Sequence, residues 1–474
     1  MKMMAGPERI PIPAVLPLAV ALLFALCASA PLVAAGADPV DFPGAVERAL
    51  QNNAAVSAAG YEWSSAQKGA EAARGDYLPK LSLEGSFVRT NVPAEAFALK
   101  LNQKRLLDTD FSDVSNFNEP SPVNDYITLF TLEQPIFAPR AYHGMKMASR
   151  EAEATGFDVS RKKEEAVFRV LTAYLGVLTA KEYVRVAEQE LSDAREAFRI
   201  AEVKEKAGVG LASDVLRARV FLATAESDQV TAESRLALAQ AGLGLAMGEP
   251  RGARMDAVAP VPPLPEPGTL EERMAAVGAH RFDLRAFSLR LENADANLTL
   301  RRSDYLPTVG VTGTYRIDGQ DGIFSPDNRT WNVGVGLRWN LFDGLSREAE
   351  VGRASAERGR AREYYRGAED LAAFEVTQAF LAVDEASRRV EIARAAVAAA
   401  EEGTRLVKAR YENQLARMID LLDAQTAQNA ARADLVRAEN DLLRSRAQLE
   451  YASGGLLSWA LPGSEDSRGK GGGR

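Results

Sequence analysis

The sequence predicts a mainly α-helical chain built from two structural repeats, each a β-hairpin followed by a pair of long antiparallel helices. Three observations predict this fold. The motif Asp-Tyr-Leu-Pro occurs twice, and its tyrosines, Tyr77 and Tyr305, lie 228 residues apart. Each copy precedes two short segments in which apolar and polar residues alternate, the pattern of β-strands. A long helical pattern without proline follows each hairpin, and the distance from the end of the hairpin to an aspartate beyond that helix is 77 residues in the first copy and 78 in the second.

The first 37 residues have the pattern of a secretory signal peptide. Lys2 and Arg9 provide a positive start, an apolar stretch follows, and residues 35–37 form a small-x-small cleavage site before Asp38. We therefore expect the mature chain to begin near Asp38. The alternative is an uncleaved membrane anchor, which Pro11, Pro13 and Pro17 disfavour because they shorten the usable helix.

Composition excludes several classes of function. The chain has 474 residues, 26% of them charged, and a net charge of −8, which argues against nucleic-acid binding because that usually needs a basic patch. Its one cysteine, Cys27, lies in the predicted signal peptide, so neither a disulfide nor a thiolate metal site is expected in the mature chain. His143 and His280 are isolated in sequence. We find no catalytic constellation and expect no enzyme activity, no cofactor and no metal.

The first repeat is predicted to span residues 38–248. It begins with an approach helix and contains a long polar connection, 91–124, typical of an external loop. Glycines at 208 and 210 mark the reversal between the two long helices. The expected elements are strands at about 78–91 and 124–137, a long helix at about 140–208 and a return helix at about 212–247.

A proline-rich linker, 249–268, separates the repeats, because its five closely spaced prolines cannot continue a helix. The second repeat is predicted to span 269–455, and the Gly-rich charged tail, 456–474, is expected to be disordered. The expected elements are an approach helix at about 281–302, strands at about 308–318 and 330–342, a long helix at about 345–412 and a return helix at about 418–452.

The strands carry one apolar and one polar face. Trp331, Val333, Val335, Leu337 and Trp339 alternate with polar residues and glycines, and Tyr315 lies on the apolar side of its own segment. Trp331, Trp339 and Tyr315 are therefore predicted as membrane-interface aromatics; the alternative is packing against a sheet partner. Four strands per chain cannot close a membrane barrel, which needs at least eight. We expect several chains to share one barrel, and three would supply twelve strands.

The duplicated motifs resemble those of the TolC-like outer membrane efflux proteins over nearly the whole mature chain. The motifs on which this resemblance rests are Gln134-Pro135-Ile136-Phe137, residues 339–344, Gly210–Leu216, and Arg410-Tyr411-Glu412 followed by residues 419–425. The resemblance implies a homotrimer in outer-membrane lipid, with a 12-stranded β-barrel continued by an α-helical tunnel into the periplasm. Its implied partners are a periplasmic adaptor (membrane fusion) protein and an inner-membrane transporter. The implied function is the exit duct of a tripartite efflux or type I secretion system.

The resemblance also implies a site. The aspartates after the helix reversals, Asp420 and Asp423 with Asp214, correspond to the periplasmic entrance of the family, whereas Gln414 stands where the family usually has glycine. The alternative for Asp420 and Asp423 is a pair of solvated acidic residues at a helix start, where the helix dipole favours them. The alternative for the whole chain is a periplasmic coiled-coil adaptor or structural tether without a pore.

Overall fold

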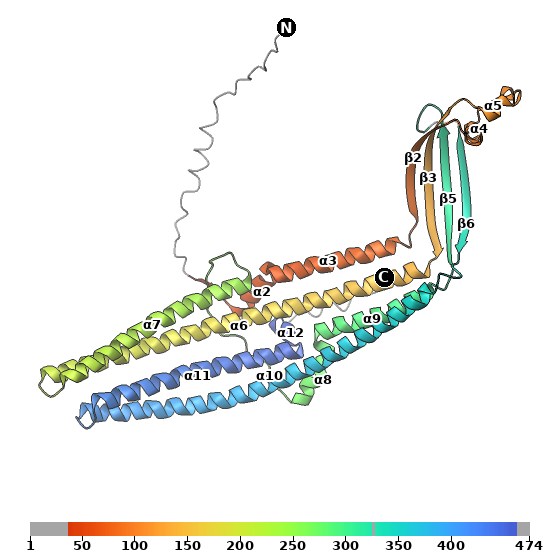
Figure 1. Ribbon diagram of the computed structural model, residues 1–474. Helices are drawn as coiled ribbons and strands as arrows, with labels where there is room; N and C mark the ends of the chain where they lie inside the picture. Colours follow the sequence, from red (N-terminus) through yellow and green to blue (C-terminus); the bar gives the residue numbers. More distant parts are fainter. Residues whose placement is uncertain (1–36, 325–327, 462–474) are drawn as a thin grey trace, which may run out of the picture.

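The computed structural model describes residues 37–324 and 328–461, so the predicted signal peptide, apart from Ala37, and the end of the predicted tail lie outside the described residues. The molecule is elongated, with a small β-sheet at one end and long helices running away from it (Figure 1). Among the helices of the described residues, none combines the length and apolarity that crossing a membrane requires.

The sheet is assembled from both repeats. Its strands are β2 (Lys80–Thr90), β3 (Val123–Phe137), β5 (Thr308–Gly319) and β6 (Arg329–Arg338), and they pair antiparallel in the order β2-β3-β5-β6. The two hairpins therefore join through β3 and β5. The register places an apolar row on one face of the sheet, formed by Leu83, Phe130, Tyr315 and Trp331.

Two of the predicted strand bounds are wrong. β2 begins at Lys80 instead of residue 78, because Leu78 and Pro79 belong to the turn that ends the preceding helix. β6 ends at Arg338 instead of residue 342. There the indole nitrogen of Trp339 donates a hydrogen bond to the carbonyl oxygen of Tyr305, 3.1 Å away, in the junction between strands and helices.

The helices of the two repeats match in length. The approach helices α3 (Ala54–Gly75) and α9 (Phe282–Ser303) have 22 residues each, and the return helices α7 (Ala212–Met247) and α11 (Met418–Ser453) have 36 each. The long helices α6 (Pro139–Lys206) and α10 (Ser346–Glu412) have 68 and 67 residues. At about 1.5 Å per residue, each long helix spans roughly 100 Å. All four long and return helices lie within two residues of their predicted bounds.

The sequence prediction missed the break within the first approach segment and, in the second repeat, the short helix that precedes the approach helix. A short helix, α2 (Phe42–Asn52) or α8 (Leu270–His280), precedes the main approach helix, with Asn53 or Arg281 extended between them. The return helix of the same repeat ends against this break. A Cβ on Gly248 would lie 2.7 Å from the Asn52 carbonyl oxygen, and one on Gly454 would lie 2.8 Å from the His280 carbonyl carbon. Both glycines also have positive φ. Glycine is therefore required at each position by the backbone conformation as well as by the close contact.

The largest hydrophobic core lies midway along the helices and contains three elements that the sequence did not reveal. β1 (Asp38–Val40) pairs in parallel with β4 (Met255–Ala257), which lies inside the predicted proline-rich linker. The region predicted as a disordered tail begins with a helix, α12 (Leu456–Ala460). Leu456 is fully buried, and the ring centres of Trp459 and Phe42 lie 5.3 Å apart. Apolar side chains of α12 therefore complete this core.

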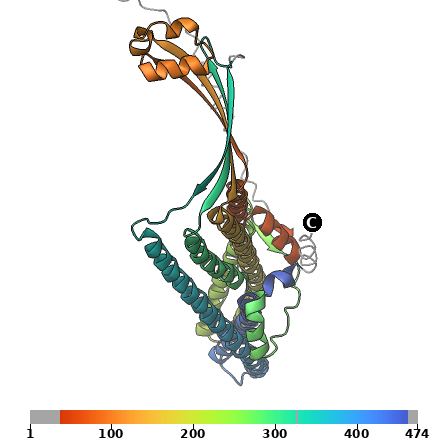
Figure 2. The same ribbon diagram turned by 90° about the vertical axis from the view of Figure 1, so that its right-hand side faces the viewer.

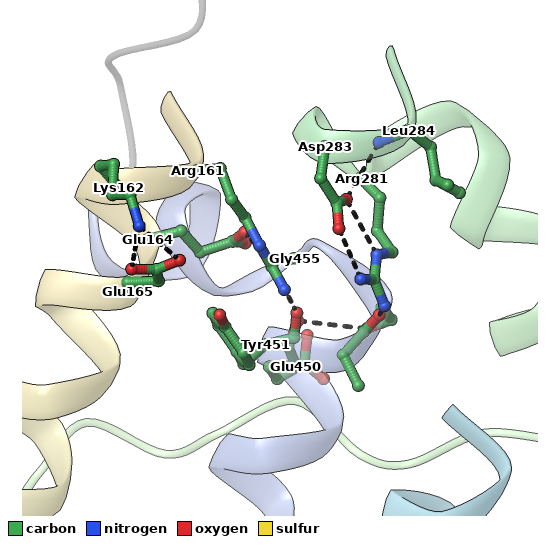
Figure 3. A network of polar contacts seen from close by, with 12 residues as sticks. Arg161, Lys162, Glu164, Glu165, Arg281, Asp283, Leu284, Glu450, Tyr451 and Gly455 are labelled. Atoms are coloured by element: carbon green, nitrogen blue, oxygen red, sulfur yellow. Dashed lines mark hydrogen bonds and ion pairs between the residues drawn. The ribbon is translucent and has the colours of Figure 1, made fainter. Parts of the chain in front are cut away.

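Buried charges join the two repeats near this core (Figure 3). Arg281, which is 4% exposed, forms ion pairs of 2.6 Å with both Asp283 and Glu375. From α6, Arg161 pairs with the buried Glu164 at 2.7 Å and lies 4.0 Å from the ring centre of Tyr451 on α11. Burial opposes the charge of Glu164 and raises its pKa, with Arg161 acting in the opposite sense. The Arg281 pairs lie within the second repeat, whereas the contact of Arg161 with Tyr451 joins the two repeats.

The predicted polar loop 91–124 is a folded insertion. It contains α4 (Pro93–Asn102), a 3-10 turn at Asp108–Phe111 and the short helix α5 (Ser115–Asn118). Phe97, Phe111 and Phe117 pack together with ring centres 5.5 to 6.3 Å apart, which gives the insertion a small core of its own. Figures 1 and 2 show it at the end of the sheet farthest from the helices.

Candidate functional site

The candidate site is the tip formed by the two helix reversals, at the end farthest from the sheet (Figure 1). The reversals of both repeats pack on one another there. Alanines of α6 and α7 contact the start of α11, and the shared core is completed by the end of α10. Its buried members are Ala197, Ala201, Ala218, Tyr411, Met418, Leu421 and Leu422.

The two reversals reach the same backbone geometry with different residues. Gly208 turns the chain between α6 and α7 with φ of 76°, and Gln414 turns it between α10 and α11 with φ of 62°. A side chain in this left-handed region costs about 1–2 kcal/mol relative to glycine. The backbone amide of Leu415 donates a 2.7 Å hydrogen bond to the carbonyl of Arg410, which holds the turn closed.

Lys204 of the first repeat links the tip to Tyr411 of the second. Its ammonium group donates a hydrogen bond to the Tyr411 carbonyl oxygen and lies 3.9 Å from the centre of the Tyr411 ring. Burial raises the pKa of the Tyr411 phenol, and the nearby charge of Asp214 raises it further. Asp214, which is half-buried, is therefore close enough for its charge to act on Tyr411.

Asp420 and Asp423 lie around Arg417 at the start of α11. The Asp420 carboxylate accepts hydrogen bonds of 2.9 Å from both the guanidinium and the backbone amide of Arg417, so it caps the helix. These two hydrogen bonds lower the pKa of Asp420. Asp423 is exposed one turn further on, and its charge adds to that of Asp420 in raising the pKa of Arg417. Sequence reasoning missed Arg417, although its three-residue spacing from Asp420 is that of an ion pair near a helix start.

The predicted interface aromatics lie at two levels of the sheet. Tyr315 pairs with Trp331 near the end that carries the insertion, whereas Trp339 lies at the junction with the helices. Trp331 is 76% exposed and Trp339 is 55% exposed. Eight residues separate them, which corresponds to about 26 Å along a strand. Between them, Val333, Val335 and Leu337 are also exposed.

The described residues, 37–324 and 328–461, contain no group of three or more histidine, cysteine, aspartate or glutamate side chains placed to hold a metal ion. The features that stand out in this part of the chain are instead the exposed apolar sheet, the long paired helices and the charged tip.

Comparison with known proteins identifies the family. The model of the outer membrane efflux protein family matches residues 45–249 and 276–455, which together cover most of the chain. The chain belongs to the outer membrane efflux protein family. The prediction of an outer-membrane efflux channel is thereby confirmed, and with it the location of this efflux protein in the outer membrane, extending into the periplasm.

Curated relatives of this efflux protein agree with this assignment, and similar solved structures of other proteins share its fold. The alkaline protease secretion protein AprF of Pseudomonas aeruginosa is 25% identical over 72% of each chain. The outer membrane efflux protein BepC of Brucella suis is 23% identical over 71% of this chain and 75% of its own. The CmeC channel of Campylobacter jejuni, 17% identical, superposes with a TM-score of 0.72 over 88% of this chain and 86% of its own. The predicted fold class is confirmed by such structural neighbours.

Proposed function

We propose that three copies of this efflux protein form one exit duct, each copy contributing four strands to a 12-stranded barrel and its helices to a periplasmic tunnel. The observation that carries the proposal is the sheet itself. Its apolar face is exposed, and among the described residues the edge strands β2 and β6 each pair on one side only. Unpaired strand edges are not tolerated in lipid. Closure with further copies would satisfy both edges at once.

The strand directions support closure by rotation. The four strands alternate in direction, so β6 of one copy and β2 of the next run antiparallel. A ring of three chains would therefore be antiparallel throughout, as bacterial membrane barrels are. A soluble tether, the alternative function, would leave the exposed row of Val333, Val335 and Leu337 in water.

The apolar face would meet outer-membrane lipid. Tyr315 with Trp331 on one side and Trp339 on the other would form the two aromatic girdles that border the lipid-facing band. The expected height of such a band is about 25 Å, and a strand tilted by about 40° places the two tryptophans roughly 20 Å apart along the membrane normal. The charged helices would then lie in the periplasm.

Asp420 and Asp423 would form the periplasmic entrance of the duct. Together with Arg417, which is ion-paired with Asp420, the cluster carries two negative charges and one positive charge in each copy. Three copies around one axis would bring a net negative charge to a narrow opening, which attracts cations. Asp214 would act differently, because its neighbour Tyr411 belongs to the contact between the repeats.

The partners follow from this geometry. A duct of about 100 Å needs an inner-membrane transporter to load it and a periplasmic adaptor to align the two. Neither catalysis nor a nucleic-acid partner is part of the proposal. Two similar proteins are named for protease secretion and two for pyoverdine export, so both protein and small-molecule cargo occur among the relatives. The transporter encoded next to this chain would define its cargo class.

Conductance of the purified protein in planar bilayers tests the entrance. The double variant Asp420→Ala with Asp423→Ala leaves Arg417 alone, so the charge of the opening changes sign. We expect cation block to be lost and conductance to rise. Asp434→Ala, which removes an exposed ion pair with Arg437 on the same helix, is the matched control and should change neither. Unchanged block in the double variant would remove the entrance assignment.

A further inference from the structure

The folded insertion between β2 and β3 lies over one particular face of the sheet. Ala96 and Leu99 of α4 are buried against Val123, and Val88 packs against the same cluster. Val88 is paired with Asp125 across the β2–β3 ladder, and Val123 precedes Asp125 by two residues. All three strand residues therefore lie on the face opposite Phe87 and Tyr126, whose rings are paired 4.8 Å apart on the apolar side.

The hydrogen bonds of Gln103 to Asn124 and Asp125, called the latch below, hold α4 in this position. The side-chain nitrogen of Gln103, at the end of α4, donates to a carboxylate oxygen of Asp125 at 2.9 Å and to the carbonyl of Asn124 at 2.7 Å. Asp125 and Asp318 are fully buried, and Arg316 lies between them. Its guanidinium is 2.6 Å from Asp318 and 3.6 Å from Asp125.

The latch is incompletely satisfied. One carboxylate oxygen on each of Asp125 and Asp318 is buried without accepting a hydrogen bond, and one guanidinium faces two carboxylates. A buried polar atom without a partner costs about 1–3 kcal/mol. The insertion is therefore held in a defined position by the Gln103 hydrogen bonds and by the apolar contact of α4 with the sheet.

We infer that the insertion is a size-selecting constriction at the outer mouth of the duct. The inference rests on the proposed trimer, in which the apolar face meets lipid and the polar face therefore lines the pore. A barrel of twelve strands spaced by about 4.8 Å and tilted by about 40° is roughly 24 Å across, measured between backbones. A helix with its side chains is about 10 Å wide. Three copies of α4 at the rim thus occupy most of the opening.

The exposed side of the insertion fits this position. Leu101, Leu107, Phe111 and Val114 are each more than half exposed although they belong to a folded unit with its own aromatic core. Around a three-fold axis these side chains face the same residues of the other two copies. The occupant of this apolar surface is therefore a second copy of the same insertion.

Cysteine labelling from outside intact cells tests the constriction independently of the periplasmic tip. Ser82→Cys places a thiol on the polar face, opposite Thr131 and below the insertion, in a mature chain predicted to have no other cysteine. A small maleimide should label it in every background. A maleimide carrying a 5-kDa polyethylene glycol should label it at least tenfold faster when residues 93–119 are replaced by a short Gly-Ser connection.

Point variants and a control position sharpen the test. Gln103→Leu removes both latch hydrogen bonds and should also accelerate labelling by the large reagent. Glu119→Gln, an exposed position of the insertion outside both the latch and the apolar surface, should not. Asp321→Cys, exposed in the β5–β6 connection, should be labelled equally in all backgrounds. Equal labelling of Ser82→Cys by the large reagent with and without the insertion overturns the constriction. Failure of the small reagent in every background would instead show that the polar face lines no water-filled pore, which overturns the proposed duct.

Discussion

Gly454 and its counterpart Gly248 show how a single backbone position can hold a repeat together. Each ends a return helix with positive φ, and each faces the backbone of the break in its approach segment without room for a side chain. The same contact occurs in both repeats, so the duplication preserved the geometry although the residues at the break, Asn53 and Arg281, differ.

Gly454→Ala should therefore destabilise the helices strongly. The left-handed conformation costs about 1–2 kcal/mol and the clash with His280 adds about 1–3 kcal/mol. Gly344 has a similar φ of 71° but nothing within 4 Å of its Cβ position, so Gly344→Ala should incur only the first cost. The midpoint of thermal helix loss, followed by circular dichroism in detergent, compares the two. Equal midpoints would contradict the close approach.

The lowered pKa of Asp420 predicts a pH response at the tip. Because the folded-state pKa lies below the usual value of 3.8, the cap on α11 is fully effective above that pH and is lost as the pH falls through the lower folded-state pKa. Amides of residues 418–424 should then exchange faster at pH 3 than at pH 5, after correction for intrinsic rates. Asp420→Asn should abolish the difference, and a difference that persists in that variant would exclude Asp420 as its source.

At the scale of elements, the buried network around Arg281 determines how α9, α10 and α11 meet. Burial opposes the charge of Arg281, but hydrogen bonds to Asp283 and Glu375 outweigh it, so its pKa is raised and it stays charged. It also donates to the carbonyl of Ala452 at the end of α11. One side chain thus ties three helices together.

Arg281→Ala should cost about 3 kcal/mol, because it leaves two partly buried carboxylates without their partner. Arg389 forms a comparable 2.6 Å ion pair with Glu385 within α10, but both side chains are more than 60% exposed. Arg389→Ala should therefore change stability by less than about 1 kcal/mol. The thermal unfolding midpoints of the two variants test this difference. Similar decreases in midpoint for Arg281→Ala and Arg389→Ala would show that the buried network is not structurally important.

At the scale of the whole molecule, the two faces of the sheet should tolerate charge differently. Val333 lies on the exposed apolar face and the neighbouring Asn332 on the polar face. An arginine on the lipid face near the membrane centre costs about 2–4 kcal/mol, whereas one on the pore face does not. We expect Val333→Arg to lower the yield of trimer in the outer-membrane fraction several-fold and Asn332→Arg to leave it near the wild-type level. Equal yields would contradict the assignment of the faces.

Local periodicity made much of this architecture predictable. Alternation places Tyr315 and Trp331 on one face, and the long spacing without proline gives α6, α7, α10 and α11 to within two residues. The folded insertion was predicted as a loop, because its order depends on Phe97, Phe111 and Phe117 meeting one another. At the tip, Asp420, Asp423 and Asp214 were predicted from the sequence as site residues, whereas Arg417 and Lys204 were not.

The sequence by itself determined the repeated order of elements, the two faces of the strands and the length of the long helices, because each depends on patterns of residues close together along the chain. Only the tertiary structure decided that β1 pairs with β4, that α12 completes the core and that Lys204 contacts Tyr411. These contacts join residues on separate elements, many of them hundreds of positions apart. Their energy depends on packing and burial in three dimensions, which no periodic pattern along the chain records.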